Sequence, residues 1–218
     1  MKKSFIVIGL GRFGSNIAKT LIENNCDVLA VDISEESVKR VSSFVPHCVI
    51  ADATKEQVLV ELGAKSIDHA VVAIGNNLQA SILTIMNLKH LGVPRITVRA
   101  DEEGHKEVYR TLGATEVIIP EESAAISLGN QIISDSILDY YTVSRSYAMV
   151  KVNIGRDFKE NLIELDLRNS YGINIVGIIK EDGEFFIPRG TDKLIKGEVA
   201  VVVGTKPKIK KFDDFLNE

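Results

Sequence analysis

The sequence is short of cysteine, of positive charge and of long apolar runs. Its two cysteines, Cys26 and Cys48, show no CxxC spacing, and although His47 adjoins Cys48, reduced thiols in the cytosol are a better account than a disulfide or a zinc site. No apolar run approaches the roughly 20 residues that cross a bilayer, so we expect a chain that is neither secreted nor inserted in a membrane. Lys and Arg number 26 against 30 Asp and Glu, a balance that argues against nucleic-acid binding.

The first half of the chain has the pattern of a parallel sheet wrapped by helices. Up to about residue 120, short β-branched apolar runs alternate with helical periodicity, and most runs are too continuously apolar to keep one wet face. This alternation predicts an α/β fold, a Rossmann-like doubly wound parallel sheet with strand order 3-2-1-4-5-6. The predicted strands are Phe5–Ile8, Val28–Asp32, Cys48–Ala51, Ala70–Ile74, Ile96–Ala100 and Glu116–Ile119.

The alternation of strand and helix patterns ends at about Pro120. Apolar residues at helical spacing predict a helix over Glu122–Tyr141, which either covers its own sheet or crosses to a partner subunit. We expect a nucleotide-binding domain over 1–122, a crossover or dimerisation helix and linker over 123–144, and a small α+β domain over 145–218. A domain of that size is marginal alone and should pair with a copy of itself. Its predicted elements are strands at Ala148–Ile154, Ile173–Ile179, Glu184–Ile187 and Val199–Val203, and a helix near Asn161–Ser170.

Local signals mark several turns and helix starts. Ser34 is a predicted N-cap, and Thr54 with Gln57 fits a capping box. The residues Glu181–Glu184 predict a hairpin turn. Four lysines lie between positions 206 and 211, and we interpret them as the solvated face of a tail.

A glycine-rich motif follows the first predicted strand directly. Gly9, Gly11 and Gly14 form GxGxxG and open a helix, which is the context that the dinucleotide-binding fingerprint requires. Gly9 permits the tight turn, Gly11 lets the backbone approach a pyrophosphate, and Gly14 allows close packing of helix on strand. Orphan amide groups and the positive end of the helix dipole then face the phosphates. Asp32 ends the second strand, where a carboxylate accepts from ribose hydroxyls and repels a 2′-phosphate.

The ends of the other strands complete the predicted adenine-nucleotide site. Arg12 lies inside the loop, where a guanidinium suits phosphate oxygens, unless it is only a surface arginine. Asp52 and Thr54 follow the third strand and either face the adenine edge or serve as caps. Gly75 follows the fourth strand at the topological switch point, where it either admits a ligand or precedes a helix capped by Asn76 or Asn77. The other residues assigned to the site are Phe13, Ile33, Ala53, Ile74, Asn77 and Arg99.

Several stretches together resemble the KtrA/TrkA family of K+ transport regulators, proteins that contain regulator-of-K+-conductance (RCK) domains. The resemblance covers essentially the whole chain. One Rossmann lobe followed by one C-terminal lobe is similar to the KtrA branch rather than to the tandemly duplicated TrkA form. The stretches are Gly9–Gly14 with Arg12-Phe13, Val31-Asp32, Ala51-Asp52-Ala53-Thr54, Val71–Ile74 ending at Gly75, Gln79-Ala80-Ser81, and Leu167–Gly172 with the following Ile173–Ile179 strand and the Gly183 hairpin.

The resemblance implies a cytoplasmic regulatory subunit, peripheral on the inner face of the cell membrane. Dimers assembled into an octameric ring would dock on a K+-translocating membrane subunit (KtrB/TrkH-like). ATP and ADP would favour different ring shapes, and NAD(H) is an alternative ligand. Arg12 matches the arginine that contacts terminal phosphates in such proteins. Glu121 matches a position where the family can place a divalent cation, Mg or Ca, between paired nucleotide sites, although a carboxylate at a helix start has an equally simple structural explanation.

The C-terminal lobe resembles a second ligand site of the same family. Leu162-Ile163, Asp166, Arg168 and Asn174, with Pro188 assigned to the same place, are similar to a pattern linked with cyclic di-AMP binding. The pattern departs at Val176 and Gly177, where longer aliphatic residues are expected. Arg168 could equally pair with Asp166 or Glu164 on the surface.

The rival interpretation is an NAD-dependent oxidoreductase or an NAD-binding redox sensor, because the same fold and fingerprint serve all three classes. The sequence offers no place for hydride chemistry. No Tyr-x-x-x-Lys pair follows the fourth strand, the chain has only four histidines, and the region after residue 147 is small for a substrate domain. The missing basic surface and helix-turn-helix pattern argue against a transcriptional sensor. We therefore expect no catalytic residues and no enzyme activity.

Overall fold

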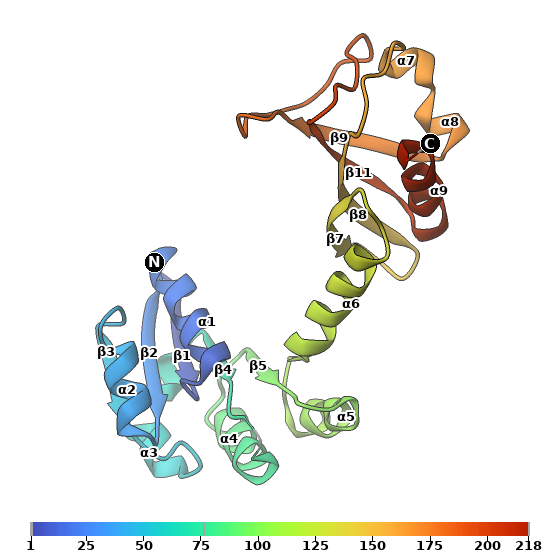
Figure 1. The fold of residues 1–218 in the computed structure, drawn as a ribbon. Helices are drawn as coiled ribbons and strands as arrows, with labels where there is room; N and C mark the ends of the chain where they lie inside the picture. Colours follow the sequence, from blue (N-terminus) through green and yellow to red (C-terminus); the bar gives the residue numbers. More distant parts are fainter. Residues whose placement is uncertain (1, 76, 218) are drawn as a thin grey trace. The chain divides into compact units, whose positions relative to one another are not determined.

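The computed structural model describes residues 2–75 and 77–217 of the 218-residue chain. The chain divides into two compact units, Met1–Pro120 and Glu121–Glu218, and each has its own sheet and its own core (Figure 1). Asn76, one of the two residues predicted to cap a helix, lies outside the described residues. None of the helices in the described ranges combines the length and the apolar character that crossing a bilayer requires.

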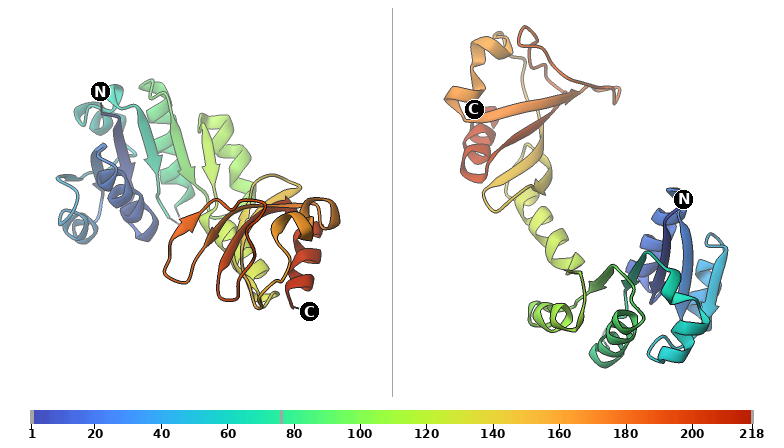
Figure 2. Two further views of the ribbon diagram at one scale, coloured as in Figure 1. Left: turned by 90° about the horizontal axis from the view of Figure 1, so that it is seen from above. Right: turned by 180° about the vertical axis from the view of Figure 1, so that it is seen from behind.

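The first unit is the predicted Rossmann-like sheet. Its six strands are all parallel and lie in the order β3-β2-β1-β4-β5-β6, which confirms the predicted order (Figure 2). The strands are β1 (Ser4–Ile8), β2 (Asp27–Asp32), β3 (His47–Ile50), β4 (His69–Val72), β5 (Ile96–Arg99) and β6 (Glu116–Ile118). The connecting helices are α1 (Arg12–Glu23), α2 (Glu35–Val41), α3 (Glu56–Glu61), the 3-10 turn η1 (Ala64–Ser66), α4 (Leu78–His90) and α5 (Glu103–Leu112).

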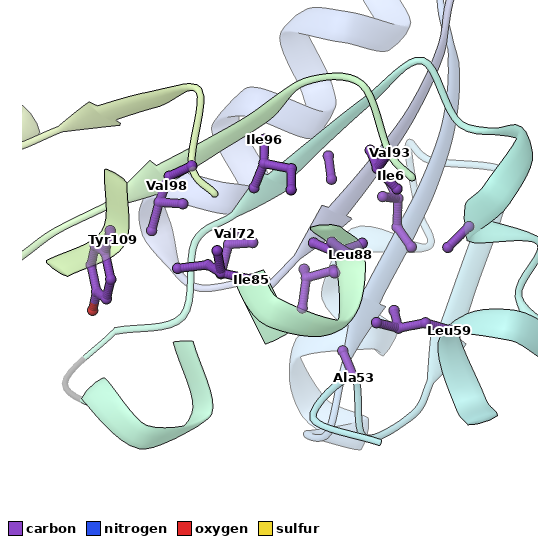
Figure 3. Packing of buried hydrophobic residues seen from close by; sticks show 14 of the residues in the cluster. Ile6, Ala53, Leu59, Val72, Ile85, Leu88, Val93, Ile96, Val98 and Tyr109 are labelled. Atoms are coloured by element: carbon purple, nitrogen blue, oxygen red, sulfur yellow. The ribbon is translucent and has the colours of Figure 1, made fainter. Parts of the chain in front are cut away.

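Alternate residues of the central strand β1 enter two different cores. Ile6 packs in a cluster with residues of α3, α4 and α5, where Ile85 and Leu88 are fully buried (Figure 3). Val7 points to the other face and packs with Ala18 of α1 and residues of α2. Successive side chains of a strand point to opposite faces, so a sheet covered on both sides needs continuously apolar strands. Because all six strands are parallel, their carboxyl ends lie at one edge of the sheet, where the loops that lead to the helices begin.

The second unit contains an antiparallel five-stranded sheet in the order β10-β9-β11-β8-β7. Its strands are β7 (Ile137–Thr142), β8 (Tyr147–Asn153), β9 (Ile173–Ile179), β10 (Phe185–Phe186) and β11 (Val199–Thr205). Its helices are α6 (Pro120–Ile132), α7 (Leu162–Leu165), α8 (Leu167–Ser170) and α9 (Lys206–Asn217). The predicted hairpin is confirmed, since the Lys180 amide donates to the Glu184 carbonyl across the turn.

The predicted helix over Glu122–Tyr141 is wrong in its second half. Helix α6 ends at Ile132, and β7 then pairs with β8 along its length. The Ser134 hydroxyl accepts hydrogen bonds from the amides of Ser136 and Ile137, which stops the helix and turns the chain. The apolar residues after position 133 fit the period of a helix and also that of a strand. The strand forms because the backbone of β8 pairs with it, and this tertiary contact cannot be read from the sequence pattern.

Two further elements differ from the sequence-based expectation. The predicted helix at 161–170 is broken at Asp166, which adopts a left-handed φ of 42° between α7 and α8. The lysines after Thr205 belong to α9, whose opposite side buries Ile209, Phe212 and Leu216 in the core of the second unit. Their interpretation as a solvated face agrees with their exposure, but the tail is a packed amphipathic helix.

Candidate functional site

The glycine-rich loop lies between β1 and α1 and is held against the ends of two neighbouring strands. The Gly9 amide donates to the Val31 carbonyl at 2.9 Å, and Gly9 has a φ of 93°. A Cβ on Gly9 would lie 2.7 Å from the backbone of Ala73, and one on Gly14 would collide with the Gly9 carbonyl oxygen. The fold itself therefore requires glycine at both positions.

Gly11 stands in a different environment from the other two glycines. Apart from its two chain neighbours and the adjoining helix backbone, no described residue comes within 4 Å of the place where its Cβ would be, so packing does not require glycine there. Gly11 is the N-cap of α1, and no side chain caps this helix end. The amides of Gly11 and Arg12 make no hydrogen bond to other described residues. The result is an open cradle of backbone donors at a helix N-terminus, the geometry that binds phosphate.

The Asp32 carboxylate joins the end of β2 to this loop. One oxygen accepts from the Leu10 amide at 2.6 Å and the other from the Ser34 amide at 2.8 Å. A carboxylate has about four acceptor positions, so Asp32 retains acceptor capacity for ribose hydroxyls. Ser34 also caps α2 by accepting from the Ser37 amide, which confirms the predicted N-cap.

The side chains that face solvent beside this loop suit a purine nucleotide. Ile33 follows Asp32 and is 74% exposed, so its apolar side chain is free to pack against a base. Arg12 is exposed, and its guanidinium forms no ion pair within the described ranges. Phe13 is half-buried. A free guanidinium at the mouth of an amide cradle can bind phosphate oxygens in bidentate fashion.

The loop after β3 is fixed by its own hydrogen bonds. Asp52 accepts from the Thr54 hydroxyl at 2.6 Å and from the Thr54 amide at 3.1 Å, and the first of these holds the pKa of Asp52 below its usual value. The Thr54 carbonyl accepts from Asn87 of α4. The predicted capping box of Thr54 is wrong, because Lys55 is the N-cap of α3. Ala53 is buried in the core, so this segment shapes the edge of the site.

The ends of β4 and β5 bring two predicted residues together. A Cβ on Gly75 would lie 3.4 Å from a terminal guanidinium nitrogen of Arg99, and Arg99 also pairs with Asp101 at 3.0 Å. Asn77 caps α4 by accepting from the Ala80 amide at 2.9 Å, which is its structural role. Ile74 is half-buried just before Gly75.

Sequence reasoning missed Arg40, in the last turn of α2. Its guanidinium donates to the Leu10 carbonyl at 2.8 Å, so it touches the same loop residue as Asp32. Basic residues are common in the last turn of a helix, so no local pattern distinguishes Arg40 from other surface arginines.

Glu121, the predicted metal ligand, lies exposed in the first turn of α6, in the second unit. Within the described residues, no group of three or more His, Cys, Asp or Glu side chains gathers where it could hold a metal ion. One carboxylate is too few for a divalent cation, which takes about six or more oxygens. The remaining ligands would have to be phosphates or groups of a second copy.

The second unit has a pocket of about 340 Å³. Asp166, Arg168, Asn174 and Pro188 all belong to its lining, whereas Val176 and Gly177, where the family pattern departs, do not. Both oxygens of Asp166 accept from the Asn169 side chain, and no ion pair of the described chain joins Arg168 to Asp166 or Glu164. The full lining is Leu162, Ile163, Asp166, Leu167, Arg168, Ile173, Asn174, Ile175, Pro188, Arg189 and Gly190.

Comparison with known proteins gives matches in both units. Residues 5–120 match the TrkA-N domain and residues 159–217 match the TrkA-C domain. The Ktr system potassium uptake protein C of Bacillus subtilis (strain 168) is 40% identical over 98% of this chain and 97% of its own length.

Solved structures share the fold at lower identity. The GsuK channel bound to NAD superposes with a TM-score of 0.69 at 16% identity, over 100% of this chain and 40% of its own, so this chain spans less than half of that one. The AMP-bound CTD of Kef from Shewanella denitrificans superposes with a TM-score of 0.52 at 26% identity, over 60% of this chain and 79% of its own.

Proposed function

We propose, on the premise that the chain belongs to the KtrA/TrkA family, that it is the regulatory subunit of a K+ uptake system and responds to an adenine nucleotide. Its partner is a K+-translocating membrane subunit (KtrB/TrkH-like), and its place is the cytoplasmic face of the cell membrane, where it is peripheral. Its role is to gate transport, without catalysis. The identity of 40% to a Ktr system potassium uptake protein along almost the whole chain supports this assignment.

The observation that carries nucleotide binding is the open cradle at Gly11. The described residues leave room around this glycine and leave the Gly11 and Arg12 amides without acceptors, and phosphate supplies the missing acceptors. Asp32 then takes the ribose, and Ile33 lies against the base. AMP in the related Kef domain supports an adenine nucleotide.

Arg12 gives the site a way to distinguish ATP from ADP. The guanidinium beside the cradle makes stronger hydrogen bonds to the terminal γ-phosphate of ATP than to the terminal β-phosphate of ADP. A ligand shifts a conformational equilibrium only by its differential affinity for the two states. In this proposal the contact biases two arrangements of an octameric ring that is assembled from dimers. Coupling of about 1–3 kcal/mol per site is typical. In this scheme NAD(H) is the alternative ligand.

Titration of the purified protein with ATP, ADP and NADH tests the nucleotide role. We expect ATP and ADP to raise the melting temperature more than NADH, since a ligand that binds only the folded state stabilises it. The variant Arg12→Ala should lose the preference for ATP over ADP. Lys19→Ala, at the other end of the same helix and exposed, is the matched control. Absence of heat and of thermal protection with every nucleotide would exclude the proposal.

The further ligands are proposed from the family pattern. Glu121 would share a divalent cation, Mg or Ca, with phosphates and a second copy, and Glu121→Gln should then remove any cation dependence of nucleotide affinity. The pocket of the second unit would take cyclic di-AMP, because Arg168 offers a donor for phosphate and aliphatic side chains line the rest. Arg168→Ala should abolish that binding, whereas Arg145→Ala, exposed and outside the lining, should not.

An assay for hydride transfer tests the rival function, that of an NAD-dependent oxidoreductase. An NAD-dependent oxidoreductase of this fold would oxidise or reduce a substrate with NAD(H), whereas a gating subunit would change its oligomeric size or shape on binding nucleotide. Light scattering with each nucleotide added, together with K+ uptake by cells carrying the gene and its membrane partner, separates these two outcomes.

A further inference from the structure

Arg40 holds the backbone of the glycine-rich loop from outside. Its Nη2 donates to the Leu10 carbonyl at 2.8 Å, while the amide of the same leucine donates to Asp32 at 2.6 Å. The Leu10 side chain is fully buried in a cluster that also contains Val38 and Val41 of α2. Both backbone groups of Leu10 and its side chain therefore have fixed partners.

Fixing this carbonyl also fixes the direction of the next amide. The described peptide bonds are all trans, and in a planar trans peptide the C=O and the N–H point in opposite directions. With the Leu10 carbonyl turned toward Arg40, the Gly11 N–H points away from Arg40. No group of the described chain accepts a hydrogen bond from that amide, and the space beside Gly11 is open.

We infer that Arg40 is a positioning residue for the phosphates: it turns the Leu10–Gly11 peptide so that the Gly11 amide donates to a pyrophosphate group. This inference rests on the proposed nucleotide binding and adds a residue to it. A charged donor on the carbonyl also polarises the peptide and strengthens its N–H as a donor. Without Arg40, the peptide can rotate, and part of its population would aim a carbonyl at the phosphate.

The position of Arg40 separates this role from a role in folding. Arg40 is exposed as a whole although Leu10 is buried, so the space that a shorter side chain vacates at position 40 lets water reach the Leu10 carbonyl. Val38 and Val41 still hold α2 on the sheet. Loss of Arg40 should therefore change ligand affinity and leave the melting temperature of the free protein nearly unchanged.

The test compares Arg40→Gln with Lys39→Gln in the full chain. Lys39 is the preceding residue of the same helix, is exposed, and its ammonium group pairs with Glu35 at 3.6 Å; its substitution removes the same charge, and no hydrogen bond or ion pair of the described residues joins its side chain to the loop. Calorimetry and competition against a fluorescent ADP analogue give affinities for adenosine, ADP and ATP. Arg40→Lys, which keeps a charged donor, is the conservative variant.

We expect Arg40→Gln to lower the affinity for ADP and ATP about tenfold, which corresponds to about 1.4 kcal/mol, and to change adenosine affinity less than about twofold, because adenosine has no phosphate. Arg40→Lys should recover part of the loss, and Lys39→Gln should bind normally. Equal losses in Arg40→Gln and Lys39→Gln, no loss, or an equal loss for adenosine would overturn the inference. Failure of the wild-type protein to bind any nucleotide would instead overturn the proposed function. The wild-type titration tests the proposed function, and the comparison of variants tests the role of Arg40.

Discussion

Asp32 and Leu10, which are 22 positions apart, are joined by a hydrogen bond of 2.6 Å between a carboxylate oxygen and a backbone amide. The same carboxylate accepts from Ser34 through its second oxygen. Asp32 occupies the position that binds ribose in the dinucleotide-binding fingerprint. Here it also holds the glycine-rich loop, which follows β1, against the end of β2. The charge at this position therefore has a structural role in the free protein.

Asp32→Asn should destabilise the protein in the absence of any ligand. An amide has only one acceptor oxygen, so its nitrogen would face one of the two amides and one hydrogen bond to a charged group is lost. We expect the free energy of unfolding, measured with urea, to fall by about 1–3 kcal/mol. Asp27→Asn is the control, because Asp27 starts the same strand and is exposed, and its carboxylate forms an ion pair with the exposed Lys2 at 3.9 Å. Equal stability of the two variants would contradict this role.

Gly11→Ala and Gly14→Ala should separate ligand binding from folding. Alanine at Gly11 has open space and an ordinary φ of −64°, so the free energy of unfolding should change by less than about 1 kcal/mol. Its methyl group enters the proposed phosphate cradle, so we expect nucleotide affinity to fall at least about tenfold. At Gly14 the methyl group meets the Gly9 carbonyl, and we expect severe loss of folded protein. Melting curves with and without ADP measure both effects; a stable Gly14→Ala variant would be the contrary result.

The stability of the chain should fall below neutral pH partly through His69. Burial lowers the pKa of His69 from its usual 6.5, and the charge of Arg95 lowers it further, against the opposite effect of Glu116. The unfolded chain then binds a proton more readily than the folded chain, so this contribution is intact above about pH 6.5 and is lost as the pH falls toward the lower folded-state value.

The measurement is urea unfolding at pH values from about 7.5 down to 5. His69→Asn removes the titrating ring, whose Nε2 lies 2.8 Å from the Thr97 hydroxyl, and should flatten the pH dependence. His47→Asn, at an exposed position of β3, should leave it as in the wild type. A steeper fall in His69→Asn would reverse the assigned sign.

The corner between α6 and β7 should depend on Ser136. Asp213 of α9 is only 7% exposed and accepts hydrogen bonds from the hydroxyls of Ser134 and Ser136. Ser136→Ala removes one donor from a buried carboxylate and should lower the stability of the second unit by about 1–3 kcal/mol. Ser170→Ala, exposed at the end of α8, is the control, and similar unfolding midpoints for both variants would show that water replaces the lost donor.

Sequence reasoning succeeded where one local pattern admits one structure. GxGxxG after an apolar run and before a helical repeat has few alternatives, and the six apolar runs led to the observed strand order because the fold class restricts it. It failed where tertiary partners decide. The spacing of apolar residues predicts a helix over Ile137–Thr142, but the segment is a strand because it pairs with β8. The Thr54 hydroxyl donates to Asp52 instead of capping a helix.

The candidate site shows the same division. The glycines and Asp32 follow from spacing, whereas the contact of Arg40 with Leu10 joins positions 30 residues apart through the packing of α2, which no local pattern encodes. The left-handed Asp166 is another such case, since a non-glycine residue takes that conformation only where its surroundings compensate for it.

Helix α9 also sets an order in time. Ile209, Phe212 and Leu216 complete a core whose other members begin at Tyr140, so that core cannot close until residue 216 has been synthesised. The first unit has all its strands by Ile118 and can fold while the ribosome is still adding the rest. Nascent chains would therefore carry a folded first unit before the second unit exists, and any pairing of copies through the second unit must wait until α9 has been synthesised.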